Sequence, residues 1–478
     1  MSPPAHLVVF PYPAQGHMLP LLDFTHQLVV RFDVAVTIVI TPGNLPVISA
    51  LLSTHPSIQT LTLPFPSHPS IPQGAENVKD LGWRGNVFMI ASLPQLAPLI
   101  RSWFYSHPDP PVAVISDLFL GWTKPLAQEL GIEHFEFYGS GALFKSILLK
   151  CWKHEEIREM SEFEFSDIPG SPSFKKHELP SLFRLFEASS PDWEIVREVL
   201  AQDSYPTNFI FNSVHALESR YFDHLLKELG HDRVYAVGPV SINGLNYGKV
   251  VQDSDHSSIF DWLDSSPEGS VLYVSFGSQV FMSEEQTKGL ALGLEMSGAR
   301  FLWAFRAKSE NCYLPTGFEE RVAGRGLVLR GWAPQVRILR HEAVGGFLSH
   351  CGWNSVLEGI EAGVAFLSWP MQAEQYLNAK LLEANLGIGV RACEGVDTVP
   401  EPDELATAIR QLYGDSGKAL RLRASELKDA AFAAVAEGGS SSDHLGQIGM
   451  RLKQLGAAQM RYTCPEDSLL NHKFTVRS

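Results

Sequence analysis

The sequence predicts an α/β protein made of two doubly wound parallel-sheet domains that face each other. Short β-branched runs alternate with amphipathic helix patterns along the chain. This alternation occurs once in residues 1–239 and again in residues 258–445, and a polar stretch without periodicity, residues 240–257, lies between the two series. Because strand–helix–strand order gives parallel neighbours joined by crossover helices, each series should form its own open sheet.

The first series begins with the strand 7–10, the loop PYPAQGH and a helix pattern that runs to residue 32. We expect His17 to end this loop. The β-branched run VAVTIVIT (34–41) predicts a second strand, which stops at Pro42-Gly43. The remaining elements expected in this half, in chain order, are the strand 112–117, the helix 123–131, the strand 134–140, the strand 208–213, the helix 217–228 and the strand 234–240.

The second series follows the predicted interdomain linker, residues 240–257, and opens with the helix pattern IFDWLDSS. Its expected elements, in chain order, are the strand 271–278, the helix 284–296, the strands 300–306, 326–332 and 344–350, the helix from about residue 354, the strand 365–370, the helix 375–385 and the strand 386–392. We expect residues 446–478 to pack back on the N-terminal domain and then become disordered. Residues 457–478 in particular lack helical periodicity.

Composition narrows the class of protein. The 53 acidic residues against 38 basic ones give a net charge of −15, which makes nucleic acid an unlikely main partner. The five cysteines form no C-x-x-C pair, so we expect a reducing compartment rather than a disulfide scaffold or a zinc site. We expect neither a signal peptide nor a membrane span, and hence a cytoplasmic protein. No coiled-coil pattern argues for an oligomer, so we expect a monomer.

The stretch from Trp332 to Gln375 is the densest in candidate binding residues. VGGFLSH predicts a buried strand, and CGWNS leads from it into a helix. Asn354 and Ser355 are good N-cap residue types, and the free N–H groups of a helix start form an anion site that suits phosphate. His350, at the end of the strand, could add a hydrogen bond.

Two further residues of this stretch suit a nucleoside. Glu358 lies one turn into the same helix and could accept hydrogen bonds from ribose hydroxyls. Trp332 follows a strand and a glycine, and it offers a flat face to a base. Each residue alone is more often structural than functional, because helix caps and strand-terminal histidines occur in every α/β protein. Their order within one stretch favours function.

This ordered stretch resembles the signature of plant secondary-product glycosyltransferases, which use UDP-sugars. The signature is matched without a gap, from Trp332 through His350-Cys-Gly-Trp-Asn-Ser and Glu358 to Glu374-Gln375. The similarity extends over most of the chain, from FPYPAQGH to about EGGSSSDHLG. The resemblance implies the GT-B architecture, in which two Rossmann-like domains face each other across a cleft. One departure is Ala365, where the family usually has proline after Gly-Val.

The resemblance also implies a role for each signature residue. Trp332 stacks on uracil with Ala333 and Gln335 nearby, Glu358 holds the ribose, His350, Asn354, Ser355 and Ser278 hold the diphosphate, and Trp353, Glu374 and Gln375 line the sugar. A carboxylate beside an amide can accept from and donate to neighbouring sugar hydroxyls. In this family a terminal glutamine usually accompanies UDP-glucose, so Gln375 implies UDP-glucose as the co-substrate.

His17 and Asp117 are the candidate catalytic pair. Both follow strands that should end at the same edge of the N-terminal sheet, and a carboxylate behind a histidine fixes its tautomer for general-base catalysis. PAQGH and the stretch from Asp117 to Trp122 match the family's base and its partner. The implied reaction is one direct displacement that inverts the anomeric carbon. We expect no metal and no cofactor.

The acceptor pocket should come from the N-terminal half, where aromatic walls suit flat phenolic molecules. The candidates are Trp83, Phe88, Phe119, Trp122, Phe137 and Tyr138, with Ser140 close to the sugar, and most of these aromatics could equally be core residues. The stretch GAENVKDLG (74–82) looks like the branch of the family that acts on flavonols and hydroxybenzoates.

The sequence bears on five alternative functions. A nicotinamide dehydrogenase would share the fold, but the chain has no G-x-G-x-x-G after its first strand. A serine hydrolase would need a G-x-S-x-G elbow, and none is present. A UDP-sugar-binding protein without catalysis is disfavoured because both His17 and Asp117 are in place. Transfer to carbon, or from another UDP-sugar, would use the same scaffold.

Overall fold

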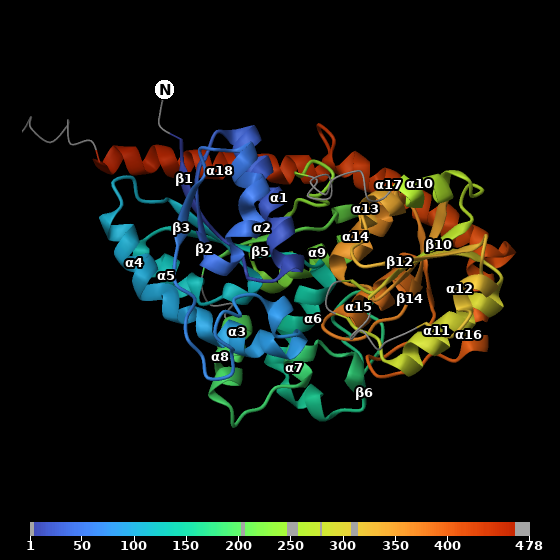
Figure 1. Cartoon of the computed structure of the whole chain (residues 1–478). Helices are drawn as coiled ribbons and strands as arrows, with labels where there is room; N and C mark the ends of the chain where they lie inside the picture. The colour runs from blue at the N-terminus through green and yellow to red at the C-terminus, as the bar shows by residue number, and fades with distance from the viewer. Residues whose placement is uncertain (1–3, 202–205, 246–256, 278–279, 307–313, 464–478) are drawn as a thin grey trace, which may run out of the picture.

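A computed structural model describes residues 4–201, 206–245, 257–277, 280–306 and 314–463, without the side chains at position 83 and positions 460–463. Two parallel sheets, each covered by helices on both faces, lie side by side (Figure 1). The predicted fold class, two Rossmann-like domains in the GT-B arrangement, is confirmed. Ser278 lies outside the described residues.

The N-terminal sheet has seven parallel strands in the order β3-β2-β1-β4-β5-β8-β9. Because β1 pairs with both β2 and β4, the strand order reverses there, and such a switch point leaves a crevice at the strands' carboxyl ends. The strands are β1 (His6–Phe10), β2 (Ala35–Ile40), β3 (Gln59–Thr62), β4 (Ala113–Asp117), β5 (Glu133–Tyr138), β8 (Asn208–Phe211) and β9 (Val234–Ala236).

Alternating side chains divide this sheet between two cores. In β5, Phe135 and Phe137 face a core that α1, α2 and α18 complete, whereas Glu136 and Tyr138 point to the opposite face. Phe137 is therefore a core residue and not a wall of an acceptor pocket. The helices of this half are α1 (Gln15–Phe32), α2 (Leu45–Thr54), α3 (Asn86–Ser92), α4 (Ala97–Ser106), α5 (Thr123–Leu130), α6 (Ala142–Lys153), α7 (Ser181–Arg184), α8 (Pro191–Ala201) and α9 (His215–Leu229).

The C-terminal sheet has six parallel strands in the order β12-β11-β10-β13-β14-β15, with the reversal between β10 and β13. Its strands are β10 (Val271–Ser275), β11 (Arg300–Phe305), β12 (Gly326–Arg330), β13 (Val344–Ser349), β14 (Ala365–Ser368) and β15 (Gly389–Arg391). Its helices are α10 (Ser257–Asp264), α11 (Glu284–Ser297), α12 (Phe318–Arg321), α13 (Gln335–Leu339), α14 (Trp353–Ala362), α15 (Gln375–Lys380), α16 (Pro402–Tyr413) and α17 (Lys418–Val435).

A segment between α6 and α8 projects from the N-terminal half towards the C-terminal half (Figure 1). It contains α7 and a small antiparallel pair, β6 (Glu162–Phe163) with β7 (Phe174–Lys175). We call residues 170–181, which run from the turn before β7 to the start of α7, the strap.

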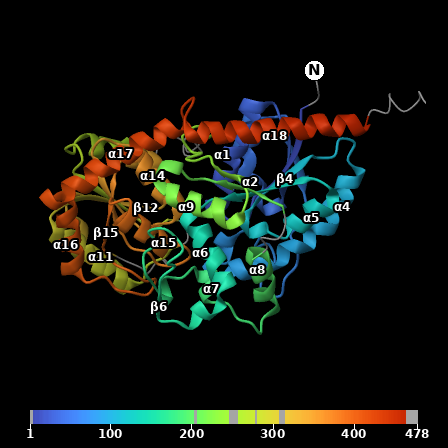
Figure 2. The same cartoon turned by 180° about the vertical axis from the view of Figure 1, so that it is seen from behind.

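The last helix, α18 (Ser440–Thr463), runs along the N-terminal half on the side of α1 (Figures 1 and 2). Its Leu445, Ile448 and Leu452 are buried in the core beside β1, and Arg451 pairs with Glu133. The expectation that helical structure stops before residue 457 is wrong, because the helix continues to residue 463. The rest of the predicted tail, residues 464–478, lies outside the described residues.

The helical stretch Asn86–Ser106 is long and apolar enough by composition to cross a membrane. It is not one regular helix, because a 3-10 turn at Leu93–Leu96 separates α3 from α4. Met89, Ile90 and Leu93 are buried in the N-terminal core. Within the described residues, no other helix meets the same criteria.

The predicted linker 240–257 is described only at its start, because residues 246–256 lie outside the described part. Val240 is buried, and its carbonyl accepts a hydrogen bond from Gln27 of α1. The hydroxyl of Ser241 donates to Glu361 of α14. This short stretch thus contacts both halves.

Candidate active site

His17 and Asp117 meet at the carboxyl edge of the N-terminal sheet. His17 lies in the first turn of α1 and does not end the loop as expected, because the helix already starts at Gln15. Asp117 is the last residue of β4 and is fully buried. The Nδ1 atom of His17 is 2.9 Å from Oδ2 of Asp117, and the other carboxylate oxygen accepts from the backbone N–H of Phe119 at 2.9 Å.

This geometry fixes the protonation state in which His17 can act. With the Nδ1–H donated to Asp117, Nε2 on the far side of the ring carries the lone pair. Burial disfavours the imidazolium, but the charge of Asp117, the hydrogen bond to it and the charge of Glu374 outweigh burial and raise the pKa of His17. The pair therefore has the geometry of a general base with an orienting carboxylate.

Two aromatic rings hold the imidazole in place. Tyr12 packs edge-on against it with ring centres 5.3 Å apart, and Phe119 lies 4.8 Å away in a tilted arrangement. The hydroxyl of Tyr12 donates to Oδ1 of Asn86 at 2.8 Å, which fixes the tyrosine in turn. These two rings also touch each other, with centres 5.0 Å apart, so the base packs against one aromatic cluster.

The facing edge of the C-terminal sheet carries the turn from β13 to α14. The N-cap of α14 is Gly352, so Asn354 and Ser355 lie inside the first turn and are not caps as expected. The expected cluster of peptide N–H groups at the end of β13 is nevertheless present. Cys351, just before it, has a φ of 63°, which is costly for a residue with a side chain. Such strain concentrates at functional turns.

His350 stands directly after β13 with its ring between two glycines. A Cβ on Gly277 would lie 2.9 Å from Cε1 of this ring, and one on Gly352 would lie 2.6 Å from Nε2. Burial lowers the pKa of His350 to about 4, so the ring is neutral at physiological pH. Its buried Nδ1 has no partner among the described residues. A neutral imidazole here can donate one hydrogen bond without adding charge.

Gln335 joins the other predicted donor residues in one network. Its Nε2 donates to Oγ of Ser355 at 3.2 Å and to Oε2 of Glu358 at 2.6 Å. Its Oε1 accepts from the hydroxyl of Tyr273 at 3.3 Å. Burial raises the pKa of Glu358 to about 7, and the hydrogen bond from Gln335 opposes this shift. Gln335 therefore orients Glu358, which the sequence placed at the ribose.

Trp332 and Ala333 stand at the entrance of this network. Trp332 follows β12 and is 48% exposed, which leaves a face of the indole accessible to a planar ligand. The carbonyl of Ala333 accepts from the N–H of Gln335 at 2.8 Å, so the turn that carries Trp332 is held to the start of α13.

The loop from Met371 to Gln375 carries the predicted sugar residues. Oε1 of Gln375 accepts the backbone N–H groups of Met371 and Gln372 at 3.0 and 3.1 Å, so its amide N–H₂ is the end left for a ligand. Burial raises the pKa of Glu374. Its carboxylate nevertheless lies close enough to His17 to raise the pKa of that residue. Glu374 is therefore a residue of the C-terminal domain that lies near the candidate base His17.

Two signature residues bind the opposite domain. Nδ2 of Asn354 donates to the carbonyl of Gly16 at 2.9 Å, next to His17. Nε1 of Trp353 donates to the carbonyl of Asn212 at 2.7 Å, and the indole is buried against the N-terminal half. The indole of Trp353 is therefore a contact between the domains, and the place beside the sugar that the resemblance implies for this residue stays a prediction.

The structure places the predicted acceptor residues in different surroundings. Tyr138 is a core residue, stacked on Phe211 with its hydroxyl bound to Glu136. Phe119 contacts His17, and Phe88 lies 5.4 Å from the ring of His68. The side chain of Trp83 lies outside the described residues.

Trp122 and Ser140 are buried, and the polar atom of each has no partner among the described residues. Ser140 is the second residue after β5, and the intervening Gly139 approaches the carbonyl of Gly16. Ser140 is thus close to the first turn of α1, which carries His17. Because buried polar atoms in folded proteins almost always have a partner, Nε1 of Trp122 and Oγ of Ser140 are candidate contacts for an acceptor.

Three residues of the site escaped the sequence analysis. Nδ2 of Asn378 donates to the carbonyl of Cys351 at 2.9 Å and lies 3.4 Å from Oε1 of Glu374. Gln372 is buried, and its Oε1 has no partner among the described residues. Ser181 contacts the backbone of the sugar loop from the other domain. Their spacing in the sequence carries no signal, because each acts through a contact made only after folding.

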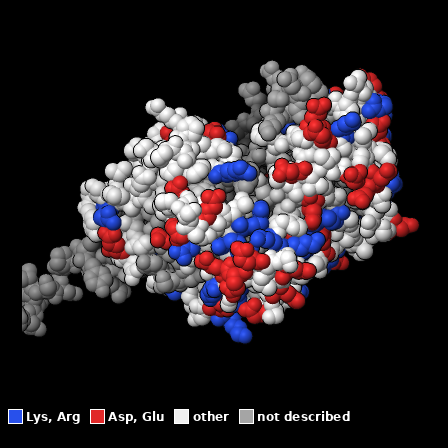
Figure 3. Space-filling model, turned by 90° about the horizontal axis from the view of Figure 1, so that it is seen from below, with Lys and Arg blue, Asp and Glu red and all other residues white. Residues whose placement is uncertain are grey.

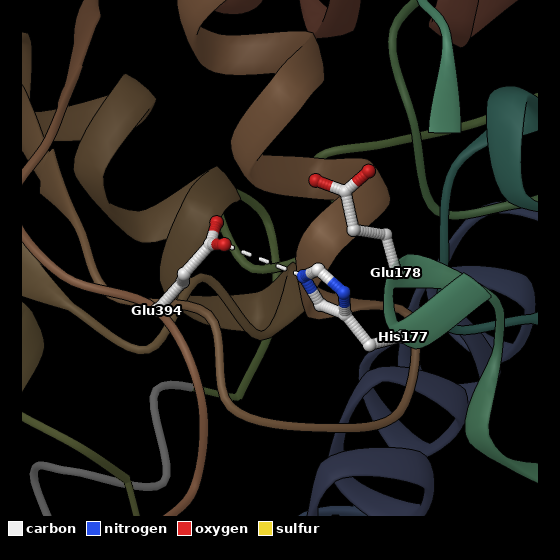
Figure 4. A group of neighbouring side chains, drawn as sticks. All are labelled: His177, Glu178 and Glu394. Atoms are coloured by element: carbon white, nitrogen blue, oxygen red, sulfur yellow. Dashed lines mark hydrogen bonds and ion pairs between the residues drawn. The ribbon is translucent and has the colours of Figure 1, made fainter. Parts of the chain in front are cut away.

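One described group of side chains could offer three ligand atoms to a metal ion: His177, Glu178 and Glu394 (Figure 4). Nε2 of His177 lies 3.3 Å from Glu394. Glu178 already pairs with Lys380 at 3.0 Å, and Glu394 pairs with Arg391. Cationic side chains therefore already neutralise both carboxylates, and the group functions as a set of ion pairs.

Fold and site together define a class of protein. Two facing Rossmann-like domains, a histidine–aspartate pair on one and a helix N-terminus with a neutral histidine on the other, characterise a nucleotide-sugar glycosyltransferase. The family model described as "UDP-glucoronosyl and UDP-glucosyl transferase" matches residues 239–427. Its match covers the half of the chain that carries the donor signature.

Whole-chain comparisons extend this match to the N-terminal half. UDP-glycosyltransferase 89A2 of Arabidopsis thaliana is 48% identical, over 92% of this chain and 94% of the relative. Flavonol 3-O-glucosyltransferase UGT89B1 of the same plant is 47% identical, over 94% and 97%. The crystal structure of Arabidopsis thaliana UGT89C1 with UDP-L-rhamnose superposes with a TM-score of 0.76 at 34% identity, covering 95% of this chain and 99% of that one. The chain belongs to the plant family 1 UDP-glycosyltransferases.

Proposed function

We propose that this enzyme transfers glucose from UDP-glucose to a hydroxyl group of a small phenolic acceptor, of the flavonoid or hydroxybenzoate type, and gives a β-O-glucoside. The observation that carries the proposal is the arrangement at His17. Its Nδ1 is held 2.9 Å from Asp117, and its pKa is raised in part by Glu374 of the facing domain. The candidate base His17 thus lies close to the loop from Met371 to Gln375, which is predicted to bind the sugar.

In the proposed reaction, Nε2 of His17 takes the proton from the acceptor hydroxyl. The oxygen attacks the anomeric carbon, and the bond to the β-phosphate oxygen breaks with its electron pair leaving on UDP. Asp117 stabilises the imidazolium that forms. The start of α14 and the neutral ring of His350 meet the growing negative charge on the diphosphate. One displacement converts an α-linked donor into a β-glucoside, and this chemistry needs no metal.

Glucose as the donor rests on the sugar loop and on the relatives. The amide N–H₂ of Gln375 and the carboxylate of Glu374 can donate to and accept from adjacent sugar hydroxyls. The relative named flavonol 3-O-glucosyltransferase is 47% identical to this chain. A more distant relative, at 36% identity, is named flavonol 7-O-rhamnosyltransferase, so UDP-rhamnose is the main competing donor.

A phenolic acceptor is supported by the surroundings of His17. Phe119 offers a ring 4.8 Å from the base, and Trp122 and Ser140 supply buried polar atoms without partners among the described residues. The crystal structure of UGT89C1 with quercetin is a related complex, at 33% identity and a TM-score of 0.75. A flat molecule with several hydroxyl groups fits these features.

The test is an assay of UDP release with UDP-glucose, UDP-rhamnose and other UDP-sugars against flavonols, hydroxybenzoates and simple alcohols. Product masses and the configuration at the anomeric carbon are recorded. We expect a product in which a hexose is joined to a phenol by a β linkage, and acid should hydrolyse this linkage. A metal chelator should not change the rate of transfer. A deoxyhexose product, an acid-stable C-linked product or retention of configuration would contradict the proposal.

A further inference from the structure

The strap, residues 170–181, lies against the C-terminal domain alongside the helix that follows the sugar loop. Lys380 of α15 donates to the carbonyl of Ser173 at 2.8 Å and pairs with Glu178 at 3.0 Å. Asn385 donates to the carbonyl of Gly170 at 3.1 Å. On the face seen from below, acidic and basic side chains lie side by side, as such ion pairs require (Figure 3). These contacts attach a part of the acceptor domain to the donor domain.

The end of the strap reaches the sugar loop itself. The backbone N–H of Ala373 donates to Oγ of Ser181 at 2.8 Å, and the N–H of Ser181 donates back to the carbonyl of Ala373 at 3.3 Å. Ser181 is buried, with 6% of its surface exposed. Both polar groups of the Ala373 backbone are therefore bound by one residue of the other domain.

Ala373 needs this support because of its backbone conformation. Its φ is 55°, in the left-handed region that residues with a side chain rarely adopt. It stands between Gln372 and Glu374, so its conformation sets the direction in which both of these side chains leave the backbone. Gln375 holds only the beginning of the loop, through Met371 and Gln372. A strained residue persists when its surroundings hold it, and here the surroundings are Ser181.

We propose that Ser181 is a positioning residue for donor-sugar recognition: by binding both backbone groups of Ala373 across the cleft, it holds the loop that presents Gln372, Glu374 and Gln375 to the sugar. The inference rests on the proposed function in one respect, because it takes this loop to face the sugar. It assigns Ser181 no contact with substrate. It also makes sugar recognition dependent on docking of the acceptor domain's strap, whereas the nucleotide is bound by the donor domain.

The decisive variants are Ser181→Ala and the double variant Ser181→Ala/Ala373→Gly. Ser181→Ala removes the hydroxyl acceptor, so we expect the KM for UDP-glucose to rise about fivefold, the effect of one net hydrogen bond. The affinity for UDP, which lacks the sugar, should stay unchanged. Discrimination between UDP-glucose and other UDP-hexoses should weaken. Ser171→Ala, in the same strap, is the matched control, because that hydroxyl donates only locally to the carbonyl of Pro172.

The double variant separates positioning from general destabilisation. Glycine adopts a φ of 55° without strain, so Ala373→Gly should keep the loop in place without Ser181. We expect Ser181→Ala/Ala373→Gly to recover a KM close to that of the wild type. The inference is overturned if Ser181→Ala leaves the KM and the discrimination unchanged, if UDP and UDP-glucose affinities fall equally, or if the double variant is not rescued.

A binding experiment keeps this test separate from the proposed function. Calorimetric titration compares UDP with the UDP-sugar that the wild type binds most tightly, in wild type, Ser181→Ala and the double variant. Absence of glucosyl transfer by the wild type would refute the proposed function. The difference between UDP-sugar and UDP affinity in the variants would still decide the role of Ser181.

Discussion

Two histidines stand at the facing edges of the two sheets, and their surroundings move their pKa values in opposite directions. His17, in the first turn of α1, has a carboxylate 2.9 Å away, and its pKa is raised. His350, after β13, is packed between two glycines, and burial lowers its pKa to about 4. The folds around them are alike, so the difference comes from the neighbour each ring is given.

The comparison shows how one architecture provides two functions. A histidine beside a buried aspartate can accept a proton and carry the resulting charge, which suits the acceptor side. A histidine without a counter-ion stays neutral and acts as a fixed dipole, which suits the proposed diphosphate site, where the start of α14 would meet the charge. A similar division separates Asp117, which is paired with a base, from Glu358, which a neutral glutamine orients.

The sharpest test of this difference is His17→Ala. Removal of the base should lower kcat/KM by roughly 1000-fold, within the 10²–10⁴-fold range that general bases contribute. The affinity for UDP, measured by calorimetry, should not change, because the proposed UDP site lies at the edge of the other sheet. His154→Ala, at an exposed histidine, serves as the control. Retention of most of the transfer activity would show that His17 is not the base.

Asp117→Asn should lower kcat/KM by roughly 100-fold, because the amide can no longer stabilise the imidazolium. His17 acts as a base only when neutral, so the wild-type kcat/KM should fall as the pH drops below its raised pKa, which lies above 6.5. Loss of the carboxylate lowers that pKa, so the acidic limb of the profile should move to lower pH. A limb that moves upward or stays in place would contradict the assignment.

His350→Ala should weaken UDP-glucose binding about tenfold, because a hydrogen bond to a charged group is lost. Since the pKa of His350 is about 4, this residue should give wild-type UDP-glucose affinity no pH dependence in the neutral range. The acidic limb of kcat/KM should remain in the variant, because it belongs to His17. Titrations with UDP-glucose at several pH values test both statements. A strong pH dependence that vanishes in His350→Ala would mean that the ring is charged.

Asn354→Ala should have the smallest effect. It removes the 2.9 Å hydrogen bond to the carbonyl of Gly16, which ties the donor turn to the helix that carries His17. A loss of about fivefold in kcat/KM is expected from one net hydrogen bond. Steady-state kinetics with both substrates measures it. A loss as large as that of His17→Ala would mean that Asn354 takes part in the chemistry.

Local pattern predicted much of the molecule. Alternating strand and helix patterns predicted both sheets, because the periodicity of buried side chains can be recognised within a short stretch of sequence. The pairing of His17 with Asp117 followed from the rule that parallel strands end at one edge, and the structure places these residues in hydrogen-bond contact. Helix boundaries were less accurate: α1 starts before His17 and α18 continues beyond residue 457.

Contacts between distant segments could not be predicted in this way. The residues around Trp353 in the sequence do not show that its indole binds the carbonyl of Asn212. The residues around Tyr138 do not show that it is a core residue. Ser181 and Ala373 are 192 positions apart in the sequence.

The sequence by itself determined the fold class, the two sheet edges and the residue types that face the cleft, because these depend on patterns within a few residues. Tertiary structure alone decided which carboxylate lies beside His17, that His350 is neutral, and that Ser181 of the other domain holds the sugar loop. The physical reason is that burial, pKa and hydrogen-bond partnership depend on atoms that only the folded chain brings together.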